Sequence, residues 1–326
     1  MQRPKVLVTQ AIPEEGLAIL RQEAEVQVNE KEGPLSREEL LAALCDKDGV
    51  LAMLADILDR EAMDAAPHLR VISNYAVGIN NIDVPEATRR GIVVTNTPGV
   101  LTEATADLAW ALLMAVARRI VEADAYVRAG KFTGWAPKLL LGGEVNGKVL
   151  GIVGLGRIGE AVARRARGFN MRVLYYQRTR RSPEEEARLG VEYRPLHDLL
   201  READFVSLHV PLTPETRYLI GARELALMKP TAYLINTARG PVVDEAALVE
   251  ALRARRIAGA GLDVFEHEPA LTPGLADLEN VVLAPHIGSA TYETRAKMAV
   301  LAANDLLAAL RGERPQHIVN PEVLGG

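Results

Sequence analysis

The stretch Val149-Leu-Gly-Ile-Val-Gly-Leu-Gly-Arg-Ile-Gly159 decides the fold of this chain. Its β-branched start predicts a strand and its end predicts a helix, so that three glycines form the turn between them. In such a turn the first glycine permits a tight bend, the second lets the backbone approach a pyrophosphate, and the third lets helix and strand pack closely. The helix N-terminus would face the phosphates. We therefore predict a dinucleotide site formed by Gly154, Leu155, Gly156, Arg157, Ile158 and Gly159.

Short β-branched runs alternate with amphipathic stretches along nearly the whole chain, which predicts parallel sheets covered by helices. A capping box at Ser36 predicts the start of a helix, Asp244 is expected to cap another, and a long apolar helix is expected from about Thr102 to Val127. The last helix, near Thr291 to Arg311, is expected to pack back against the first sheet. Strands are expected at Val6–Thr9, Gly49–Met53, Leu69–Ser73, Ile92–Thr95, Val149–Val153, Arg172–Tyr176, Asp204–Leu208, Ala232–Ile235, Ala258–Leu262 and Val281–Ala284.

The predicted fold class is α/β, with two Rossmann-like doubly wound parallel-sheet domains flanking a cleft. Residues 1–98 plus 287–326 are predicted to form a discontinuous substrate (catalytic) domain. Residues 99–286 are predicted to form the dinucleotide-binding domain. A chain of 326 residues is long enough for two such cores.

Composition and charge narrow the class of protein. Apolar residues make up 48% and charged residues 25%, as in an ordinary globular enzyme. The net charge of −5 gives no reason to expect nucleic acid or an anionic membrane as a partner. The only cysteine, Cys45, cannot form an internal disulfide, and no apolar run approaches the roughly 20 residues of a membrane span. Because the apolar run at the start is also too short for a signal peptide, a cytoplasmic enzyme is expected.

Three polar residues stand among small or apolar neighbours late in the chain. Arg239 lies in Asn-Thr-Ala-Arg-Gly, Glu268 in Glu-His-Glu-Pro, and His286 in Pro-His-Ile-Gly-Ser-Ala-Thr. An arginine can bind a carboxylate through two parallel hydrogen bonds, and an imidazole beside a carboxylate can transfer a proton near neutral pH. Together with a dinucleotide site they predict hydride transfer on a small 2-keto or 2-hydroxy acid. From composition alone, His197 and His209 compete with His286, and Glu266 competes with Glu268.

The end of the strand Arg172–Tyr176 bears on cofactor choice. An NAD site usually places Asp or Glu there, whereas this chain has Gln177 followed by a basic run. A neutral residue does not repel a 2′-phosphate, and arginines form charge-assisted hydrogen bonds with it. A solvated basic loop is the alternative interpretation. We predict NADP(H) as the preferred cofactor, with NAD(H) as the alternative, and a 2′-phosphate site among Gln177, Arg178, Thr179 and Arg180, in a basic run that ends at Arg181.

Six ordered motifs resemble those of the D-isomer-specific 2-hydroxyacid dehydrogenases, in the glyoxylate/hydroxypyruvate reductase branch. The resemblance covers nearly the whole chain. It implies that Arg239 holds the substrate carboxylate and polarises its carbonyl, that His286 gives a proton to the carbonyl oxygen, and that Glu268, the acid directly before proline, holds that imidazole. The motifs are Asn74–Asp83, Gly154–Gly159, His209–Pro214, Asn236–Gly240, Gly261–Phe265 and Pro285–Thr291.

The resemblance also implies further binding residues and no metal. Trp135 would be where a dimer partner reaches toward the active site, and ordinary interface packing is its alternative role. A homodimer formed through residues 102–140 is expected. The cofactor would contact Pro211, Thr216, Thr237, Ala238, Asp263, Ile287 and Gly288, and the substrate would contact Leu54, Val77, Gly78 and Trp135, besides Arg239.

The predicted reaction is the NADPH-preferring, reversible reduction of glyoxylate or hydroxypyruvate to glycolate or D-glycerate. D-3-phosphoglycerate dehydrogenase is the nearest alternative enzyme, although the loop Asn74-Tyr-Ala-Val-Gly78 looks more like that of the reductases. Formate dehydrogenase resembles this chain less, because it has glutamine where Glu268 stands. A NAD(H)-sensing corepressor is an alternative of another class, and it resembles NAD-binding proteins that carry an acid at the position of Gln177.

Overall fold

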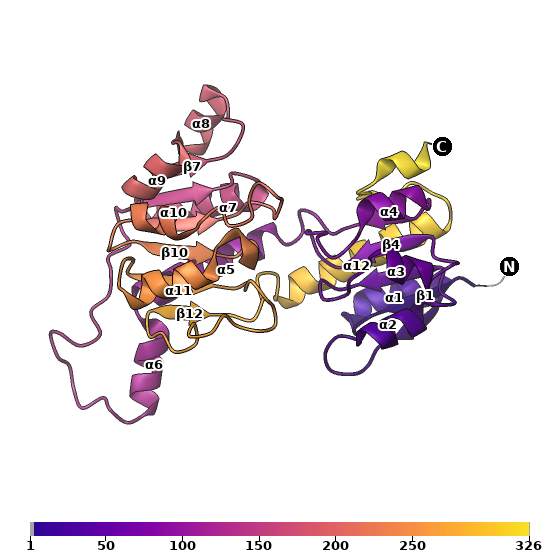
Figure 1. The fold of residues 1–326 in the computed structure, drawn as a ribbon, viewed down its shortest axis with the longest axis horizontal. Coiled ribbons are helices and arrows are strands. Elements are labelled where there is room, and N and C mark those ends of the chain that lie inside the picture. Colours follow the sequence, from indigo (N-terminus) through magenta and orange to yellow (C-terminus); the bar gives the residue numbers. More distant parts are fainter. Residues whose placement is uncertain (1–2, 326) are drawn as a thin grey trace. The chain divides into compact units, whose positions relative to one another are not determined.

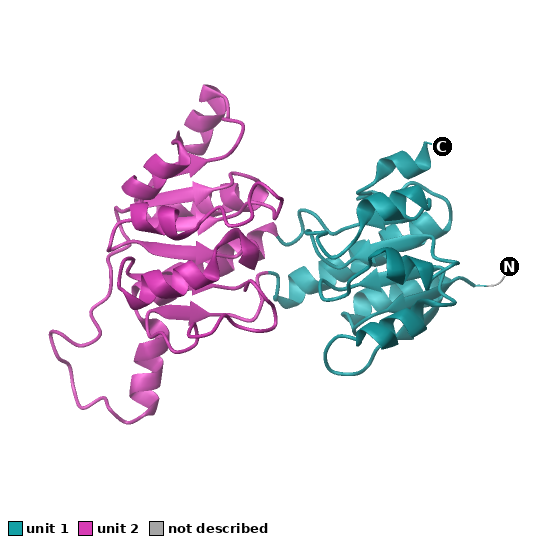
Figure 2. Cartoon of the chain, viewed as in Figure 1, with its two compact units in different colours: residues 1–101, 289–326 teal, residues 102–288 magenta. Residues whose placement is uncertain are grey.

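Two parallel sheets organise the chain, one in each of two compact units. In the computed structural model, which describes residues 3–325, unit 1 comprises residues 1–101 and 289–326, and unit 2 comprises residues 102–288 (Figure 2). Residues 1, 2 and 326, which belong to the predicted substrate domain, lie outside the described part. The predicted α/β class with two parallel-sheet domains is confirmed.

Unit 1, which is coloured indigo to purple and yellow in Figure 1, is built on a five-stranded parallel sheet. The strand order is β2-β1-β3-β4-β5. The final helix α12 (Tyr292–Leu310) packs on α1, β3 and β4, which confirms its predicted return to the first sheet. At Gly16 in α1 the approach is so close that a Cβ would lie 2.7 Å from Ala299. The other elements are β1 (Lys5–Val8), α1 (Glu14–Glu23), β2 (Glu25–Val28), α2 (Arg37–Leu44), β3 (Gly49–Ala52), α3 (Arg60–Asp64), β4 (Val71–Asn74), α4 (Val84–Arg89), β5 (Val93–Thr95) and η3 (Pro321–Leu324).

Unit 2 is built on a seven-stranded parallel sheet in the order β12-β11-β10-β9-β6-β7-β8. The strand order reverses direction between β6 and β9, and ligands of doubly wound sheets bind outside the carboxyl ends of the strands at such a point. The elements are α5 (Thr102–Ala117), α6 (Ile120–Arg128), β6 (Val149–Val153), α7 (Arg157–Ala166), η1 (Arg167–Phe169), β7 (Arg172–Tyr176), α8 (Pro183–Leu189), β8 (Glu192–Tyr193), α9 (Leu196–Glu202), β9 (Phe205–Leu208), α10 (Ala222–Leu227), β10 (Tyr233–Asn236), η2 (Gly240–Val242), α11 (Glu245–Arg253), β11 (Gly259–Leu262) and β12 (Val281–Leu283).

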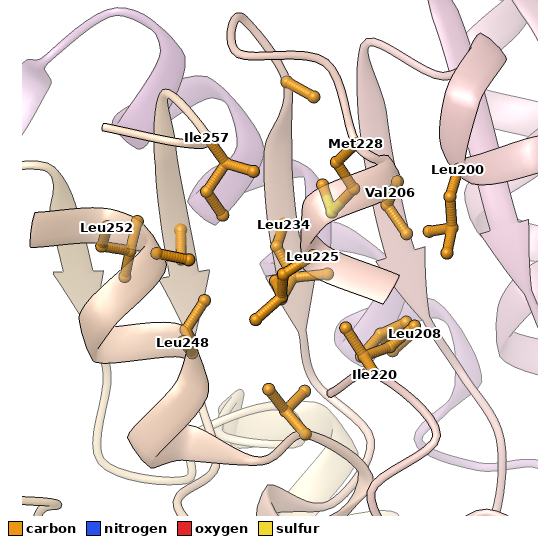
Figure 3. Packing of buried hydrophobic residues seen from close by; sticks show 14 of the residues in the cluster. Leu200, Val206, Leu208, Ile220, Leu225, Met228, Leu234, Leu248, Leu252 and Ile257 are labelled. Atoms are coloured by element: carbon orange, nitrogen blue, oxygen red, sulfur yellow. The ribbon is translucent and has the colours of Figure 1, made fainter. Parts of the chain in front are cut away.

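Apolar cores cover both faces of the seven-stranded sheet. On one face, side chains of α9, α10 and α11 pack against β9 and β10, as Leu200, Leu225 and Leu248 do in Figure 3. On the other face, α5 and α7 pack against the same sheet, with Trp110 of α5 donating to the Val162 carbonyl at 3.1 Å. Because both faces are covered, the central strands are apolar on both sides.

The single helix predicted from Thr102 to Val127 is wrong, because the structure has two helices there. The first, α5, ends at Ala117, whose carbonyl accepts the Gly143 amide at 2.8 Å instead of continuing the helix. Arg119 then takes a left-handed conformation (φ 53°), and its guanidinium binds Glu122 with contacts of 2.6 and 2.8 Å. The second helix, α6, buries no residue. Tertiary contacts therefore stop an apolar run that local pattern alone would continue.

The remaining difference from the predicted elements is two additional strands at sheet edges. The strands β2 and β8, which the sequence analysis does not predict, are edge strands whose polar residues are exposed. The capping box at Ser36 and the cap at Asp244 are both confirmed. Within residues 3–325, no helix is long and apolar enough to cross a membrane.

Candidate active site

The predicted site residues of unit 2 follow the carboxyl ends of its strands. Since carboxyl ends of parallel strands share one edge of a sheet, these side chains lie along one edge of unit 2. The glycine-rich loop follows β6, Gln177 follows β7, Pro211 follows β9, Thr237 to Arg239 follow β10, Asp263 and Glu268 follow β11, and His286 follows β12.

His286 and Glu268 form a hydrogen-bonded pair on this edge. The imidazole Nδ1 lies 2.9 Å from the Glu268 Oε2, and 32% and 37% of the two side chains are exposed. Glu268 is held by the Phe265 amide, which donates to Oε1 at 3.0 Å. Burial alone would raise the pKa of Glu268, but the hydrogen bond and charge of His286, the Phe265 amide and Arg239 together lower it. The carboxylate is therefore ionised near neutral pH and accepts the hydrogen bond of the imidazole.

The backbone at His286 is strained. Its φ is 54°, a left-handed conformation that costs free energy for a residue other than glycine. The His286 amide compensates by donating to the carbonyls of Asp263 at 2.9 Å and Ala284 at 3.1 Å. Strain of this kind is concentrated at functional sites, where the surrounding structure fixes one side-chain direction.

Arg239 is positioned by its neighbours on the turn after β10. Its Nη1 donates to the Ala238 carbonyl at 2.7 Å, while the buried Asn236 amide donates to the Arg239 carbonyl at 3.0 Å. Burial lowers the pKa of Arg239, and the charge of Glu268 opposes that shift. At Gly240 a Cβ would lie 1.9 Å from the carbonyl carbon of Phe265, so that only glycine fits there. This contact places the arginine turn directly against the segment that carries Glu268.

The competing residues have other partners. His209 is bonded through Nε2 to Ser207 Oγ at 2.8 Å, and burial lowers its pKa to about 4, so it is neutral near pH 7. His197 on α9 lies 3.3 Å from Glu224. The carboxylate of Glu266 accepts the Tyr218 hydroxyl and lies beside the start of α11, so that Glu268, not Glu266, is the acid bonded to His286.

The glycine-rich loop has the shape that a dinucleotide requires. Gly154 has φ 97°, and a Cβ there would lie 2.8 Å from the His209 carbonyl carbon. At Gly159 a Cβ would lie 2.2 Å from the Gly154 oxygen, whereas at Gly156 nothing lies within 4 Å. Among residues 3–325, no side chain caps the N-terminus of α7. Open space above Gly156 and uncapped helix amides fit a pyrophosphate, with Leu155 buried below and Arg157 and Ile158 starting the helix.

Residues of the basic run after β7 differ in whether their side chains bind another side chain of the protein. The Gln177 amide donates to the Thr179 carbonyl at 2.6 Å, and the Arg178 and Thr179 side chains are exposed. Arg180 instead binds both carboxylate oxygens of Glu186, at 2.7 and 2.8 Å. The structure thus places Gln177, Arg178 and Thr179 on an open loop, and gives Arg180, which was predicted to bind the cofactor, a partner within the protein.

Other predicted cofactor residues lie on the same edge. The Asp263 carboxylate is 1% exposed and accepts the amides of Ile287 and Gly288 at 2.7 and 2.8 Å; burial raises its pKa, and these bonds together with His286 oppose the rise. Thr237 Oγ1 is buried without a hydrogen-bond partner among the described residues, as expected of a group that awaits a ligand. Ala238 is half-buried beside it.

The turn after β9 is closed by one threonine. The Thr216 hydroxyl donates to the Pro211 carbonyl at 2.6 Å and accepts the Thr213 amide at 2.8 Å. The side chain of Thr216 therefore fixes the loop that Pro211 begins.

In unit 1, the predicted substrate residues follow the carboxyl ends of β3 and β4. Side-chain amides fix the carbonyls of the loop: Asn74 donates to Gly78 at 2.6 Å and Asn96 donates to Val77 at 2.8 Å. Each carbonyl shares a rigid peptide plane with the amide of the next residue. Fixing the Val77 and Gly78 carbonyls therefore also fixes the Gly78 and Ile79 amides. Leu54 lies half-buried in the other loop.

Asn81 and Asp56, which the sequence analysis does not single out, brace these loops. The Asn81 amide donates to the carbonyls of Met53 and Asp56 at 3.0 and 3.2 Å and to Asn74 Oδ1 at 3.2 Å. Asp56 is 2% exposed and accepts the Met53 amide at 2.7 Å. Asn81 lies within the motif Asn74–Asp83 and Asp56 lies in the loop after β3. Neither position forms a local pattern from which these contacts could be predicted.

Trp135 is 85% exposed, on the segment between α6 and β6. Its neighbourhood carries further exposed apolar side chains, namely Ile120, Val121, Val127, Phe132 and Leu141. Among the described residues, no group of three or more His, Cys, Asp or Glu could hold a metal ion.

A glycine-rich turn between β6 and α7, with an imidazole–carboxylate pair and an arginine on the same sheet edge, defines a nicotinamide-dependent oxidoreductase. Residues 110–288 match the model of the D-isomer specific 2-hydroxyacid dehydrogenase, NAD binding domain. The chain belongs to the D-isomer-specific 2-hydroxyacid dehydrogenases, in the glyoxylate reductase branch. It is an NAD(P)-dependent dehydrogenase.

Individual relatives match over almost the full chain. The glyoxylate reductase of Pyrococcus furiosus is 57% identical, and the match covers 99% of this chain and 97% of the relative. A crystal structure of a Thermus thermophilus protein is 50% identical, with a TM-score of 0.90 and coverage of 97% and 99%. The NADPH-dependent glyoxylate/hydroxypyruvate reductase of Sinorhizobium meliloti, solved with NADP and malonate, is 37% identical, with a TM-score of 0.85 and coverage of 98% and 97%.

Proposed function

We propose that this enzyme reduces glyoxylate and hydroxypyruvate to glycolate and D-glycerate, and that it uses NADPH in preference to NADH. The observation that carries the proposal is the 2.9 Å pair of His286 and Glu268 on the sheet edge that also carries Arg239 and the glycine-rich turn. Relatives named glyoxylate reductase, at up to 57% identity among those compared, support the substrate class.

His286 would supply the proton of this reduction. Its Nδ1 is bonded to Glu268, which leaves Nε2 as the nitrogen that can donate to a substrate carbonyl oxygen. Glu268 would stabilise the imidazolium before transfer and fix the orientation of the ring. When bound, a nicotinamide supplies the hydride.

Arg239 would bind the substrate carboxylate. The guanidinium has five donors, and among the described residues one of them binds the Ala238 carbonyl, so that donors remain for a substrate carboxylate. Burial strengthens such a charge-assisted pair, and the lowered pKa of Arg239 reflects the same burial. Val77, Gly78 and Leu54 on unit 1 are proposed to complete substrate binding.

The cofactor would be held by unit 2, with its pyrophosphate at the glycine-rich turn and its adenosine ribose at Gln177. Preference for NADPH is supported by the neutral Gln177 and by the exposed Arg178. Within residues 3–325 Arg178 forms no hydrogen bond or ion pair within 4 Å, and its charge helps to lower the pKa of Glu215. The Sinorhizobium meliloti relative is named as NADPH-dependent. Thr237, Ala238, Asp263, Ile287 and Gly288 are proposed to line the nicotinamide.

A homodimer formed through residues 102–140 is also proposed. Six exposed apolar side chains of α6 and the following segment, among them Trp135, support it, because exposed apolar surface is typical of an interface. Light scattering at increasing concentration would measure the mass, and a monomer at all concentrations would contradict the dimer.

One steady-state panel tests the proposed function. Glyoxylate, hydroxypyruvate, pyruvate and 3-phosphohydroxypyruvate are each measured with NADPH and with NADH. We expect the highest kcat/KM for glyoxylate or hydroxypyruvate with NADPH. A higher value for 3-phosphohydroxypyruvate would identify a phosphoglycerate dehydrogenase instead. A higher value with NADH would contradict the interpretation of Gln177 and Arg178.

A further inference from the structure

Arg181 is the last residue of the basic run, and its side chain binds other parts of unit 2. Its Nη2 donates to the Leu155 carbonyl at 3.0 Å and to Glu160 Oε1 at 2.8 Å, and its Nη1 donates to Glu185 Oε1 at 3.2 Å. Leu155 belongs to the glycine-rich turn, and Glu160 belongs to the first turn of α7. Arg181 therefore ties the loop after β7 directly to the turn after β6.

The same segment is anchored on its other side. Tyr175 accepts the Arg181 amide at 2.9 Å and donates to Glu186 Oε1 at 2.7 Å. Arg180 binds Glu186 with two contacts, and its guanidinium lies 5.3 Å from the centre of the Tyr193 ring. Arg180 and Arg181 are thus fixed by contacts within the protein, although the Arg180 side chain is 58% exposed. The side chains of Arg178 and Thr179 just before them are exposed as well.

We infer that Arg181 is a positioning residue for cofactor selectivity, which holds Arg178 at a fixed distance from the glycine-rich turn. This inference rests on the proposed cofactor site, where the turn would hold the pyrophosphate and Arg178 the 2′-phosphate. The two groups belong to one ligand at a fixed spacing, so affinity for the 2′-phosphate depends on the spacing of the two loops. Fixing an arginine before binding removes part of the entropy cost of ordering it.

Two variants separate positioning from simple attraction of charge. Arg181→Met removes the tether and one positive charge. Glu160→Gln weakens the tether but removes a negative charge from the N-terminus of α7. If Arg181 acted only through charge, Glu160→Gln would strengthen NADPH binding; if it acts by position, Glu160→Gln would weaken it. Arg172→Met, at the other end of β7, is the matched control, since Arg172 binds Glu192 and Glu202 in a similar way.

The experiment measures the Kd of NADPH and of NADH by cofactor fluorescence for the native protein and the three variants. We expect Arg181→Met and Glu160→Gln to weaken NADPH binding relative to NADH by about tenfold, the scale of ordering one long side chain. We expect Arg172→Met to leave the ratio unchanged. Thermal unfolding of each variant checks that it is folded.

A second measurement follows the loop without any cofactor. Trypsin cleaves after Arg178, and we expect this cleavage to accelerate in Arg181→Met and Glu160→Gln but not in Arg172→Met. An unchanged rate, an unchanged ratio of Kd values, or tighter NADPH binding by Glu160→Gln would each overturn the inference. The outcome is separate from that of the proposed function, because a native protein that prefers NADH contradicts the NADPH preference, whereas the change in ratio between native and variant still decides the role of Arg181.

Discussion

The carboxyl edges of the two sheets carry different chemistry. On unit 2 the edge ends in ionisable side chains, with Arg239, Glu268 and His286 close to buried backbone groups. On unit 1 the corresponding loops are held mainly by the neutral amides of Asn74 and Asn81, together with the buried carboxyl group of Asp56. The same parallel architecture therefore supports proton transfer on one edge and a fixed backbone on the other. In the proposed function, charge lies where the reaction changes charge, and the fixed backbone lies where a small acid would be recognised.

The largest effect on catalysis is expected from removing the proposed proton donor, His286. We expect His286→Asn to lower kcat by at least about 100-fold, the usual scale for loss of a general acid. Asparagine tolerates the left-handed backbone at this position better than alanine does, so the turn is retained. Single-turnover kinetics measure the step, and NADPH binding serves as the control. Unchanged turnover would show that another group supplies the proton.

The next effect should come from the shape of the arginine. We expect Arg239→Lys to raise KM for glyoxylate by roughly 10- to 100-fold, because one charge-assisted bond of the fork is lost. Steady-state kinetics measure the change, and Arg217→Lys, an exposed arginine on the same unit, is the control. An unchanged KM would mean that the carboxylate binds elsewhere.

On unit 1, removing the neutral Asn81 side chain should lower the stability of the fold. Asn81→Ala removes the side-chain donor to the buried Asp56 carbonyl and one of the two donors to the Met53 carbonyl, so we expect a loss of about 2 kcal/mol in the free energy of unfolding. Chemical denaturation measures it. KM for glyoxylate should rise while kcat stays close to native, since no proton is transferred by this loop. A fall in kcat with constant KM would contradict the comparison.

The smallest effect is expected from lowering the pH, which should change the stability of the two units differently. Arg180 and Tyr175 lower the pKa of Glu186 to about 2, so its contribution to stability is present above its unfolded pKa, near 4.5, and is lost as pH falls toward 2. Burial raises the pKa of Asp56, so the stability of unit 1 rises rather than falls when this group takes up its proton. Hydrogen exchange between pH 5 and pH 3 should show loosening near Arg180 before loosening near Met53. The reverse order would contradict these assignments.

Much of the fold follows from local sequence, whereas the partners of individual charges do not. The glycine spacing, the β-branched runs and the caps at Ser36 and Asp244 act within a few residues, so they predict elements correctly. The break after Ala117 depends on Gly143, and the pairing of Arg180 depends on Glu186 and on a ring from an edge strand. These contacts join residues whose proximity only the folded chain creates. For the same reason the bond between Glu268 and His286 could be proposed by resemblance but measured only in the structure.

The packing of α12 on α1 has a consequence for biosynthesis. Gly16 and Ala299 meet in contact close enough to exclude a Cβ, yet almost the whole polypeptide is translated between them. Unit 2 is continuous in the chain, and it can complete its core while the first sheet still lacks the helix that covers it. We expect the order of folding on the ribosome to be the reverse of the order of translation at the N-terminus, with the first strands made being among the last to acquire a stable core.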